Sequence, residues 1–372
     1  MKIGIVVHGP EVVDSGQAKL ILDKLSSMYD NLTAQLGGSM GKTAVIDAGF
    51  ENLIDINGCL KPSQSIRHLE KIENCDIVYL LTQSKSVDNG HIFGNMVIEK
   101  LDNPKIPVLQ IETQGSGVII PWTKNSTNHA KPLSDLLGLK ILTPVNIASG
   151  IYKNGSTIKR EISGVSPGEC IFLNGIIIGR SESNKVTIVV DNGFIKSIEG
   201  GTIKQHGVEK LHQYDGRVPV DIENAWIKTG LLRRSCNYSP LVKCNSTGNN
   251  DGFRAVLIDH DADNCFDLAF KVDMAVTVGD DTTIVAADIF YRFAVPVIGI
   301  IDGDRDVAFQ NMCIYPGTCI LKSKPGYDDI LGKKIGNEIF NGEKIVDFYT
   351  MESFKREIIY LGGEIIESVI QY

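Results

Sequence analysis

The sequence predicts an α/β protein in which two regions of alternating strands and helices flank a β-rich segment. Apolar, strand-like runs alternate with helix-like stretches over residues 1–150, and short strands with turn motifs occupy residues 151–235. A polar, turn-rich linker at 236–252 precedes a second alternating region at 253–372. At 372 residues the chain is also too long for one ordinary core. We therefore expect several domains.

The first region has the order expected of parallel βαβ units. Residues 3–7 form a continuous β-branched run of the kind found in buried parallel strands. Residues 15–28 carry apolar side chains at helical spacing. Two more buried strands are predicted at 76–81 and 107–112, with a helix over 91–101 between them. We predict a Rossmann-like α/β domain here.

The middle segment changes to a period of two. Short strands are predicted at 171–179, 185–190 and 194–199. An Asn-Gly turn at 174–175 and an Asp-Asn-Gly turn at 191–193 interrupt these apolar runs. Such turns favour hairpins because they supply residues with positive φ. This segment is predicted to be an antiparallel domain or insert.

The alternation returns clearly in the last region. Strands are predicted at 254–258, 274–278 and 296–301, with helices at 262–271 and 282–293 between them. The remaining chain is predicted to close this domain with further βα structure. The region therefore reads as a second parallel α/β domain.

Aspartates follow all three of these strands. They are Asp259 and Asp261 after the first strand, Asp280 after the second, and Asp302, Asp304 and Asp306 after the third. Parallel sheets bind ligands at the carboxyl ends of their strands, and carboxylates that converge there repel unless a cation neutralises them. Oxygen ligands without cysteine suit Mg²⁺ or Mn²⁺. Gly279 and Gly303 would let a bound phosphate approach the backbone. In the alternative interpretation, these acids are ordinary turn and helix-cap residues.

The same segment resembles the Toprim domain of topoisomerases, primases and related nucleases. That domain holds Mg²⁺ with the acid of its first strand and an Asp-x-Asp after a later strand, so the resemblance implies ligands at Asp259, Asp302 and Asp304 and a Toprim-like C-terminal domain. The first acid is typically glutamate in that family, which puts the general acid/base role of Asp259 in question. His260 is a candidate proton carrier beside it, because imidazole titrates near neutrality.

Over its full length the sequence is also similar to an uncharacterised conserved family best known from methanogenic archaea. The stretches that match are residues 2–11, 278–283 and 298–304. This resemblance implies no established activity.

A second set of candidate ligand residues follows the strands of the first region. His8, Gly9 and Glu11 come after the first strand, and Lys85 and His91 come after the second buried strand. Both groups belong at the carboxyl edge of the sheet, where Lys85 and His91 would meet an anionic ligand. The alternative is a capped turn and a solvated loop with internally satisfied histidines.

Motif spacing and the lengths of apolar runs argue against several classes of protein. Residues 37–43 contain Gly-Lys-Thr, but Leu36 stands where a P-loop needs its first glycine, so only a looser anion loop is left open. The eight cysteines form no Cys-x-x-Cys pair, which argues against zinc and iron–sulfur sites. No apolar run reaches the roughly 18 residues of a membrane span, and the apolar start is too short for a signal peptide. We expect a cytoplasmic protein.

The predicted function is that of a Mg²⁺-dependent enzyme acting on a phosphate ester or nucleotide, by phosphoryl or nucleotidyl transfer or by hydrolysis. One alternative is a non-catalytic protein that binds a nucleotide or another anionic metabolite. A second is a nucleic-acid-processing Toprim protein, although the net charge of −8 argues against nucleic acid as partner. The expected partner is a small phosphorylated ligand, and the sequence leaves a homo-oligomer open.

Overall fold

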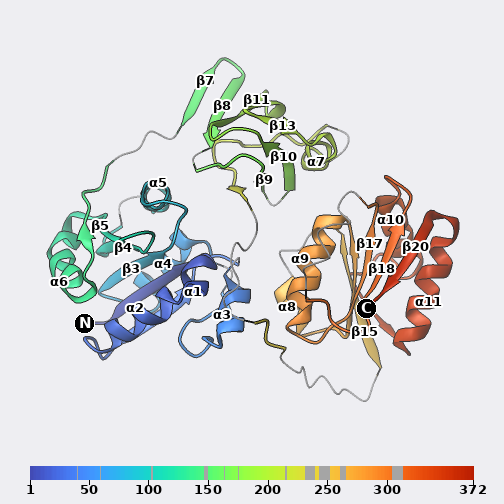
Figure 1. Cartoon of the computed structure of the whole chain (residues 1–372), viewed down its shortest axis with the longest axis horizontal. Coiled ribbons are helices and arrows are strands. Elements are labelled where there is room, and N and C mark those ends of the chain that lie inside the picture. Colours follow the sequence, from blue (N-terminus) through green and yellow to red (C-terminus); the bar gives the residue numbers. More distant parts are fainter. Residues whose placement is uncertain are drawn as a thin grey trace. The chain divides into compact units, whose positions relative to one another are not determined.

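The computed structural model shows a mixed α/β protein made of two compact units, Met1–Tyr238 and Ser239–Tyr372 (Figure 1). The structure describes residues 1–39, 41–58, 60–101, 104–145, 150–162, 164–174, 176–213, 216–230, 239–242, 252–259, 265–303 and 313–372. Within these residues, every helix is too short or too polar to cross a membrane.

The first unit contains a six-stranded sheet with the order β2-β1-β3-β4-β5-β6. Its strands are β1 (Ile3–His8), β2 (Leu32–Leu36), β3 (Ile77–Thr82), β4 (Val108–Glu112), β5 (Val118–Pro121) and β6 (Lys140–Ile141). The first four run parallel, whereas β5 is antiparallel to β4. β1 lies between β2 and β3, so the chain adds its second strand on one side of β1 and its third on the other. The strands predicted at 3–7, 76–81 and 107–112 are all present.

Helices cover both faces of this sheet. They are α1 (Glu11–Asp14), α2 (Gln17–Ser26), α3 (Lys42–Ala48), α4 (Pro62–Lys71), α5 (Val87–Glu99) and α6 (Thr127–Leu137). Ile5 and Val7 of β1 belong to a core with α2 and α6, while Val6 belongs to a core with α4 and α5. Burial on both faces explains why residues 3–7 of β1 form a continuous apolar run rather than an alternating one.

α5 lies unusually close to β4. A Cβ at Gly90 would be 2.2 Å from Glu112 Oε2, and a Cβ at Gly94 would be 2.0 Å from Gln110 Oε1. Gln110 Nε2 donates to Thr82 Oγ1 at 3.0 Å and to the Gly90 carbonyl at 2.8 Å. The two glycines therefore let the helix rest on a buried row of polar side chains.

Two four-stranded antiparallel sheets, β13-β10-β9-β14 and β12-β11-β8-β7, form the rest of the first unit. Their strands are β7 (Ile151–Asn154), β8 (Thr157–Ile162), β9 (Cys170–Leu173), β10 (Ile176–Ser181), β11 (Val186–Asp191), β12 (Phe194–Glu199), β13 (Gly201–Ile203) and β14 (Ile227–Thr229), with α7 (Gln205–Leu211). The sheets share one apolar core, to which Ile171 and Ile188 contribute. The predicted antiparallel character of this segment is confirmed.

Lys85 connects the parallel sheet to the β-rich segment. Its ammonium donates to the Gly164 carbonyl at 2.7 Å, to both carboxylate oxygens of Glu169 at 2.9 and 2.6 Å, and to Thr229 Oγ1 at 3.0 Å. Both side chains of the ion pair are about one-fifth exposed. Burial would raise the pKa of Glu169, but the hydrogen bonds from Lys85 and Ser166 outweigh burial and lower it.

We expect Lys85→Met to lower the free energy of unfolding of the first unit by about 2 kcal/mol at neutral pH, because Glu169 loses its charged donor. Since the pKa of Glu169 is lowered in the folded protein, this stabilisation is present above about pH 4.3 and is lost as the pH falls through the folded-state pKa. Urea unfolding at pH 7 and in acid measures both effects. The matched control is Lys19→Met, because the pair of Lys19 with Asp23 is exposed. An equal loss of stability in both variants would contradict the conclusion that the Lys85–Glu169 ion pair stabilises the first unit.

The second unit is a six-stranded sheet with the order β19-β15-β16-β17-β18-β20. Its strands are β15 (Phe253–Asp259), β16 (Met274–Val278), β17 (Val297–Ile301), β18 (Cys319–Ser323), β19 (Ile345–Phe348) and β20 (Ile366–Gln371). β15 to β18 run parallel. The remaining chain closes the domain with further helices and strands as predicted, and β19 and β20 both add antiparallel at the two edges. A half-exposed edge strand carries no hydropathy signal for its direction.

Helices lie on both faces of this sheet (Figure 1). They are α8 (Cys265–Ala269) and α9 (Asp280–Tyr291) on one face, and α10 (Asp328–Glu338) and α11 (Met351–Gly362) on the other. α9 is positioned closely, because a Cβ at Gly299 of β17 would be 2.3 Å from Thr283 Cγ2. The Thr277 and Thr283 hydroxyl oxygens lie 2.8 Å apart in this contact. α9 begins two residues earlier than predicted, at Asp280, as acids favour a helix N-terminus.

Candidate functional site

The carboxyl ends of β15, β16 and β17 lie side by side in a fixed register. Asp259 is aligned with Val278, and Val278 is aligned with Ile300. Asp280 and Asp302 each follow their aligned residue by two positions, so they leave neighbouring strands at equivalent points. Asp259 lies earlier along its own strand. The structure thus brings the predicted acids to one edge but sets Asp280 and Asp302 apart as the matched pair.

Strand spacing decides which of these carboxylates could share an ion. Neighbouring strands are about 4.8 Å apart, so β15 and β17 are separated by about 10 Å. Oxygen ligands of one Mg²⁺ lie about 2.1 Å from the ion and hence within roughly 4 Å of each other. The register therefore favours Asp280 with Asp302 as joint ligands. Asp259 would reach the same ligand only from the flank.

The three acids differ in their surroundings. Asp259 is exposed at the end of β15. Asp280 is only 8% exposed and is the first residue of α9. Asp302 Oδ2 accepts a hydrogen bond from the Gly326 amide at 3.1 Å, which ties the end of β17 to the loop after β18. Burial of a carboxylate favours a nearby positive group.

Sequence reasoning missed two residues at this edge. Asp328, only 3% exposed, begins α10 five residues after the end of β18. Lys322 of β18 is aligned with Ile301 of β17. A Cβ at Gly303 would lie 2.8 Å from Lys322 Nζ, so this ammonium rests against the residue after Asp302. The sequence signal that points to both residues is the short apolar run at 319–321, which belongs to β18.

Gly279 and Gly303 both have positive φ, 93° and 89°. Gly279 precedes α9, and its amide donates to the Ile300 carbonyl at 2.9 Å. At Gly303 the missing side chain makes room for Lys322. The predicted approach of a phosphate to these two glycines stays a prediction.

Some of the residues predicted to bind the metal lie outside the part of the chain that the structure describes. Within the described ranges, no group of three or more His, Cys, Asp or Glu side chains is placed to hold a metal ion. The predicted ligands Asp261, Asp304 and Asp306 and the predicted proton carrier His260 lie outside the described residues. The donors that are described at this edge, Asp259, Asp280 and Asp302, are carboxylates, which fit Mg²⁺ in chemistry. The metal and the catalytic roles of Asp259 and His260 stay predictions.

The candidate residues of the first unit are placed at the carboxyl end of β1. His8 Nδ1 lies 2.7 Å from the Gly37 carbonyl, and the ring stacks on Phe93 with centroids 4.3 Å apart. Burial is the main cause that lowers the pKa of His8. Gly9 has a φ of 86°, and a Cβ there would be 3.0 Å from Glu11 Oε2. The Glu11 carboxylate therefore folds back over the turn.

Lys85 and His91 are used differently. Lys85 forms an ion pair with Glu169, and its ammonium has four oxygen partners in all. His91 is 5% exposed, accepts from the Val145 amide at 2.9 Å, and meets the Trp122 ring edge-on at 5.1 Å. Both side chains hold segments of the first unit together. A role for them toward an anionic ligand stays a prediction.

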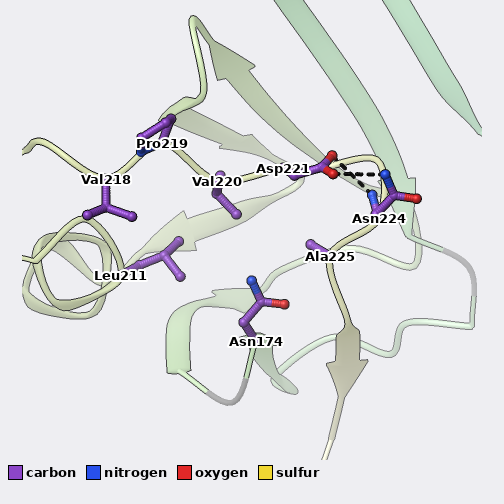
Figure 2. A pocket seen from close by; sticks show the side chains of 8 residues that line it. All are labelled: Asn174, Leu211, Val218, Pro219, Val220, Asp221, Asn224 and Ala225. Atoms are coloured by element: carbon purple, nitrogen blue, oxygen red, sulfur yellow. Dashed lines mark hydrogen bonds between the residues drawn. The ribbon is translucent and has the colours of Figure 1, made fainter. Parts of the chain in front are cut away.

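A pocket of about 240 Å³ lies in the β-rich segment, away from every residue predicted to bind a ligand (Figure 2). Its polar side chains make bonds within the protein. Asp221 accepts from Asn224 Nδ2 at 2.8 Å, and Asn174 Oδ1 accepts from the Trp226 amide at 3.0 Å. Figure 2 shows apolar side chains such as Leu211 along the rest of the wall. We assign this pocket no ligand.

Comparison with known proteins identifies the family. A protein of Methanocaldococcus jannaschii named Uncharacterized protein MJ0065 is 38% identical over 341 residues, which cover 90% of this chain and 90% of the relative. No solved structure matches the chain. The resemblance of the C-terminal region to a Toprim domain stays a prediction. A family model described as "Uncharacterized protein conserved in archaea (DUF2117)" matches residues 5–343. The predicted family resemblance is thus confirmed, and the chain belongs to this archaeal family.

Proposed function

We propose that the second unit binds a phosphate ester or nucleotide together with Mg²⁺ at the carboxyl edge of β15 to β18, and that it acts on this ligand by phosphoryl or nucleotidyl transfer or by hydrolysis. In this proposal the first unit carries a Rossmann-like domain and the second unit a Toprim-like domain. The observation that supports it best is the equivalent placement of Asp280 and Asp302 after neighbouring parallel strands.

Two carboxylates are sufficient for such a site. Mg²⁺ in phosphotransfer enzymes is commonly held by one or two carboxylates, by water and by the phosphates of the substrate itself. The lack of a group of three ligands among the described residues is therefore compatible with this kind of metal site, which is completed by its substrate. The bound ion would polarise a phosphoryl oxygen or activate a water.

Protein side chains supply the remaining charges in the proposal. Lys322 lies against Gly303 and brings positive charge beside Asp302, where it would balance a phosphate oxygen. Asp259 is exposed on the adjacent strand end and would accept the proton of an attacking hydroxyl or water. An acidic edge repels a free phosphate and accepts a Mg²⁺-bound one.

We expect the double variant Asp280→Asn with Asp302→Asn to bind Mg²⁺ in the presence of ATP at least tenfold more weakly than the wild type, because two formal charges are removed. Isothermal titration calorimetry measures this, with Mg²⁺ alone and ATP alone as reference titrations. The matched control is Asp347→Asn, since Asp347 is aligned with Arg254 at the opposite end of β15.

Unchanged binding in the double variant would refute the proposed site. A phosphate-release assay on the wild-type protein then separates an enzyme from a binding protein. Binding without turnover would support the non-catalytic alternative.

A further inference from the structure

A tight turn follows β18 at the edge where the metal site is proposed. Residues 324–327 have the sequence Lys-Pro-Gly-Tyr, with proline and glycine in the two central positions where a type II β-turn favours them. The φ of Gly326 is 75°, and the Tyr327 amide donates to the Lys324 carbonyl at 3.0 Å, as such a turn requires. The local sequence therefore fixes the shape of the connection between β18 and α10.

This turn is bonded to one of the two proposed metal ligands. The bond that closes a type II turn leaves the central amide, here that of Gly326, free for another partner, and this amide donates to Asp302 Oδ2 at 3.1 Å. In strand order, Asp302 after β17 lies between Asp280 on one side and the turn on the other. Tyr327 is the next residue after Gly326, so covalent geometry keeps its Cα within about 8 Å of Asp302 Oδ2.

Two apolar side chains beside the turn are exposed. Tyr327 is 43% exposed and Ile330 is 50% exposed. They are three residues apart at the start of α10, where Tyr327 already has helical dihedral angles, and residues at this spacing are neighbours on a helix surface. α10 lies wholly within the described residues, and the Tyr327 side chain makes no capping bond to it. Capping therefore does not explain a tyrosine at this position.

The arrangement corresponds to the two parts of a nucleotide. Mg²⁺ at Asp280 and Asp302 would hold the phosphates. The ribose separates the phosphates from the base, so a surface for the base must lie beside the metal ligands rather than among them. Aromatic side chains bind bases by stacking, because every base has a flat π-face. A phosphate ester without a base would leave Tyr327 and Ile330 without a contact.

We propose that Tyr327 and Ile330 form the base-binding surface of the site, with the Tyr327 ring stacked on the base, so that the ligand of the second unit is a nucleotide. This inference rests on the metal site proposed above. The turn sets the distance between base and metal, because its Gly326 amide is bonded to Asp302. Tyr327 determines specificity in this proposal and takes no part in the reaction.

Calorimetric titration of the full-length chain in excess Mg²⁺ tests the proposal, with ATP and inorganic tripolyphosphate as the two ligands. Both carry three linked phosphates, and only ATP has a base. We expect ATP to bind at least tenfold more tightly than tripolyphosphate. Equal affinity for the two would overturn the base-binding surface and leave the metal site standing. If neither ligand binds, the metal site and the inference that rests on it both fail.

Substitutions of Tyr327 test the stacking itself. Tyr327→Ala should weaken ATP binding about tenfold and leave tripolyphosphate binding unchanged, whereas Tyr327→Phe keeps the ring and should bind ATP like the wild type. The matched control is Tyr349→Ala, because Tyr349 is 94% exposed and follows β19 at the opposite end of the sheet. The double variant Asp280→Asn with Asp302→Asn should weaken both ligands instead. Wild-type affinity for ATP in a folded Tyr327→Ala protein would overturn the proposal.

Discussion

Glu112→Ala is expected to lower the free energy of unfolding of the first unit by about 3 to 5 kcal/mol. Glu112 is fully buried at the end of β4, and its carboxylate accepts from Thr82 Oγ1 at 2.8 Å, from the Ser84 amide at 2.9 Å and from the Gln114 amide at 3.0 Å. Alanine would leave all three donors without this acceptor. Urea unfolding measures the loss, and hydrogen exchange at the Ser84 amide locates it.

Glu112→Gln is the matched control for this prediction. An amide oxygen in the place of Oε1 can still accept from Ser84 and Gln114, and the NH₂ group can donate to the Thr82 hydroxyl, which is itself able to accept. We expect a loss of about 1 kcal/mol. If glutamine destabilised the unit as much as alanine does, the carboxylate's charge rather than its geometry would be responsible.

Gly299→Ala is expected to destabilise the second unit by about 3 kcal/mol, which is near the upper end for overpacking. The new Cβ would lie 2.3 Å from Thr283 Cγ2 and 2.8 Å from Ile320 Cδ1. α9 must then move away from β17, and Asp280 at the start of α9 moves with it. We therefore expect weaker Mg²⁺ binding together with the lower stability, as measured by thermal unfolding and calorimetry on the same sample.

A second substitution separates crowding from other causes. Thr283→Ser removes the crowded methyl group but keeps the hydroxyl that lies 2.8 Å from the Thr277 hydroxyl. Gly299→Ala combined with Thr283→Ser should be more stable than the sum of the single changes by about 1 kcal/mol. Strict additivity of the two changes would show that Gly299 is needed for some reason other than the contact with α9.

The parallel strands β1, β3, β4, β15, β16 and β17 were predictable because they are largely buried, whereas the parallel strands β2 and β18 were not predicted. Residues 3–7 of β1 and all of β17 are buried and carry only apolar residues and glycine. β2 was not predicted, because its sequence Leu-Thr-Ala-Gln-Leu mixes polar with apolar residues. It lies at the end of the strand order of its sheet, where its outer edge makes an isolated bridge to Asp55. β19 and β20 lie at edges, where hydropathy does not encode direction.

The edge at which a candidate residue lies was predictable, but its partner was not. Sequence position placed Lys85 after β3, yet its carboxylate partner Glu169 is 84 residues away, directly before β9. The register between β16 and β17 likewise depends on the whole sheet, so the pairing of Asp280 with Asp302 follows only from the structure. The Toprim resemblance instead implied that Asp259 and Asp302 are ligands of the same ion. These two residues belong to β15 and to the end of β17, and β16 lies between those strands.

The central claim is that Asp280 and Asp302 bind a divalent ion together. Crystals of the full-length protein grown with Mn²⁺ and a non-hydrolysable ATP analogue test it most directly, because manganese gives an anomalous signal. The proposal predicts an anomalous peak within about 2.2 Å of an oxygen of each carboxylate, with a phosphate oxygen in the same coordination sphere. A peak elsewhere, or no peak at the carboxyl edge of β16 and β17 in crystals that contain the nucleotide, would contradict it.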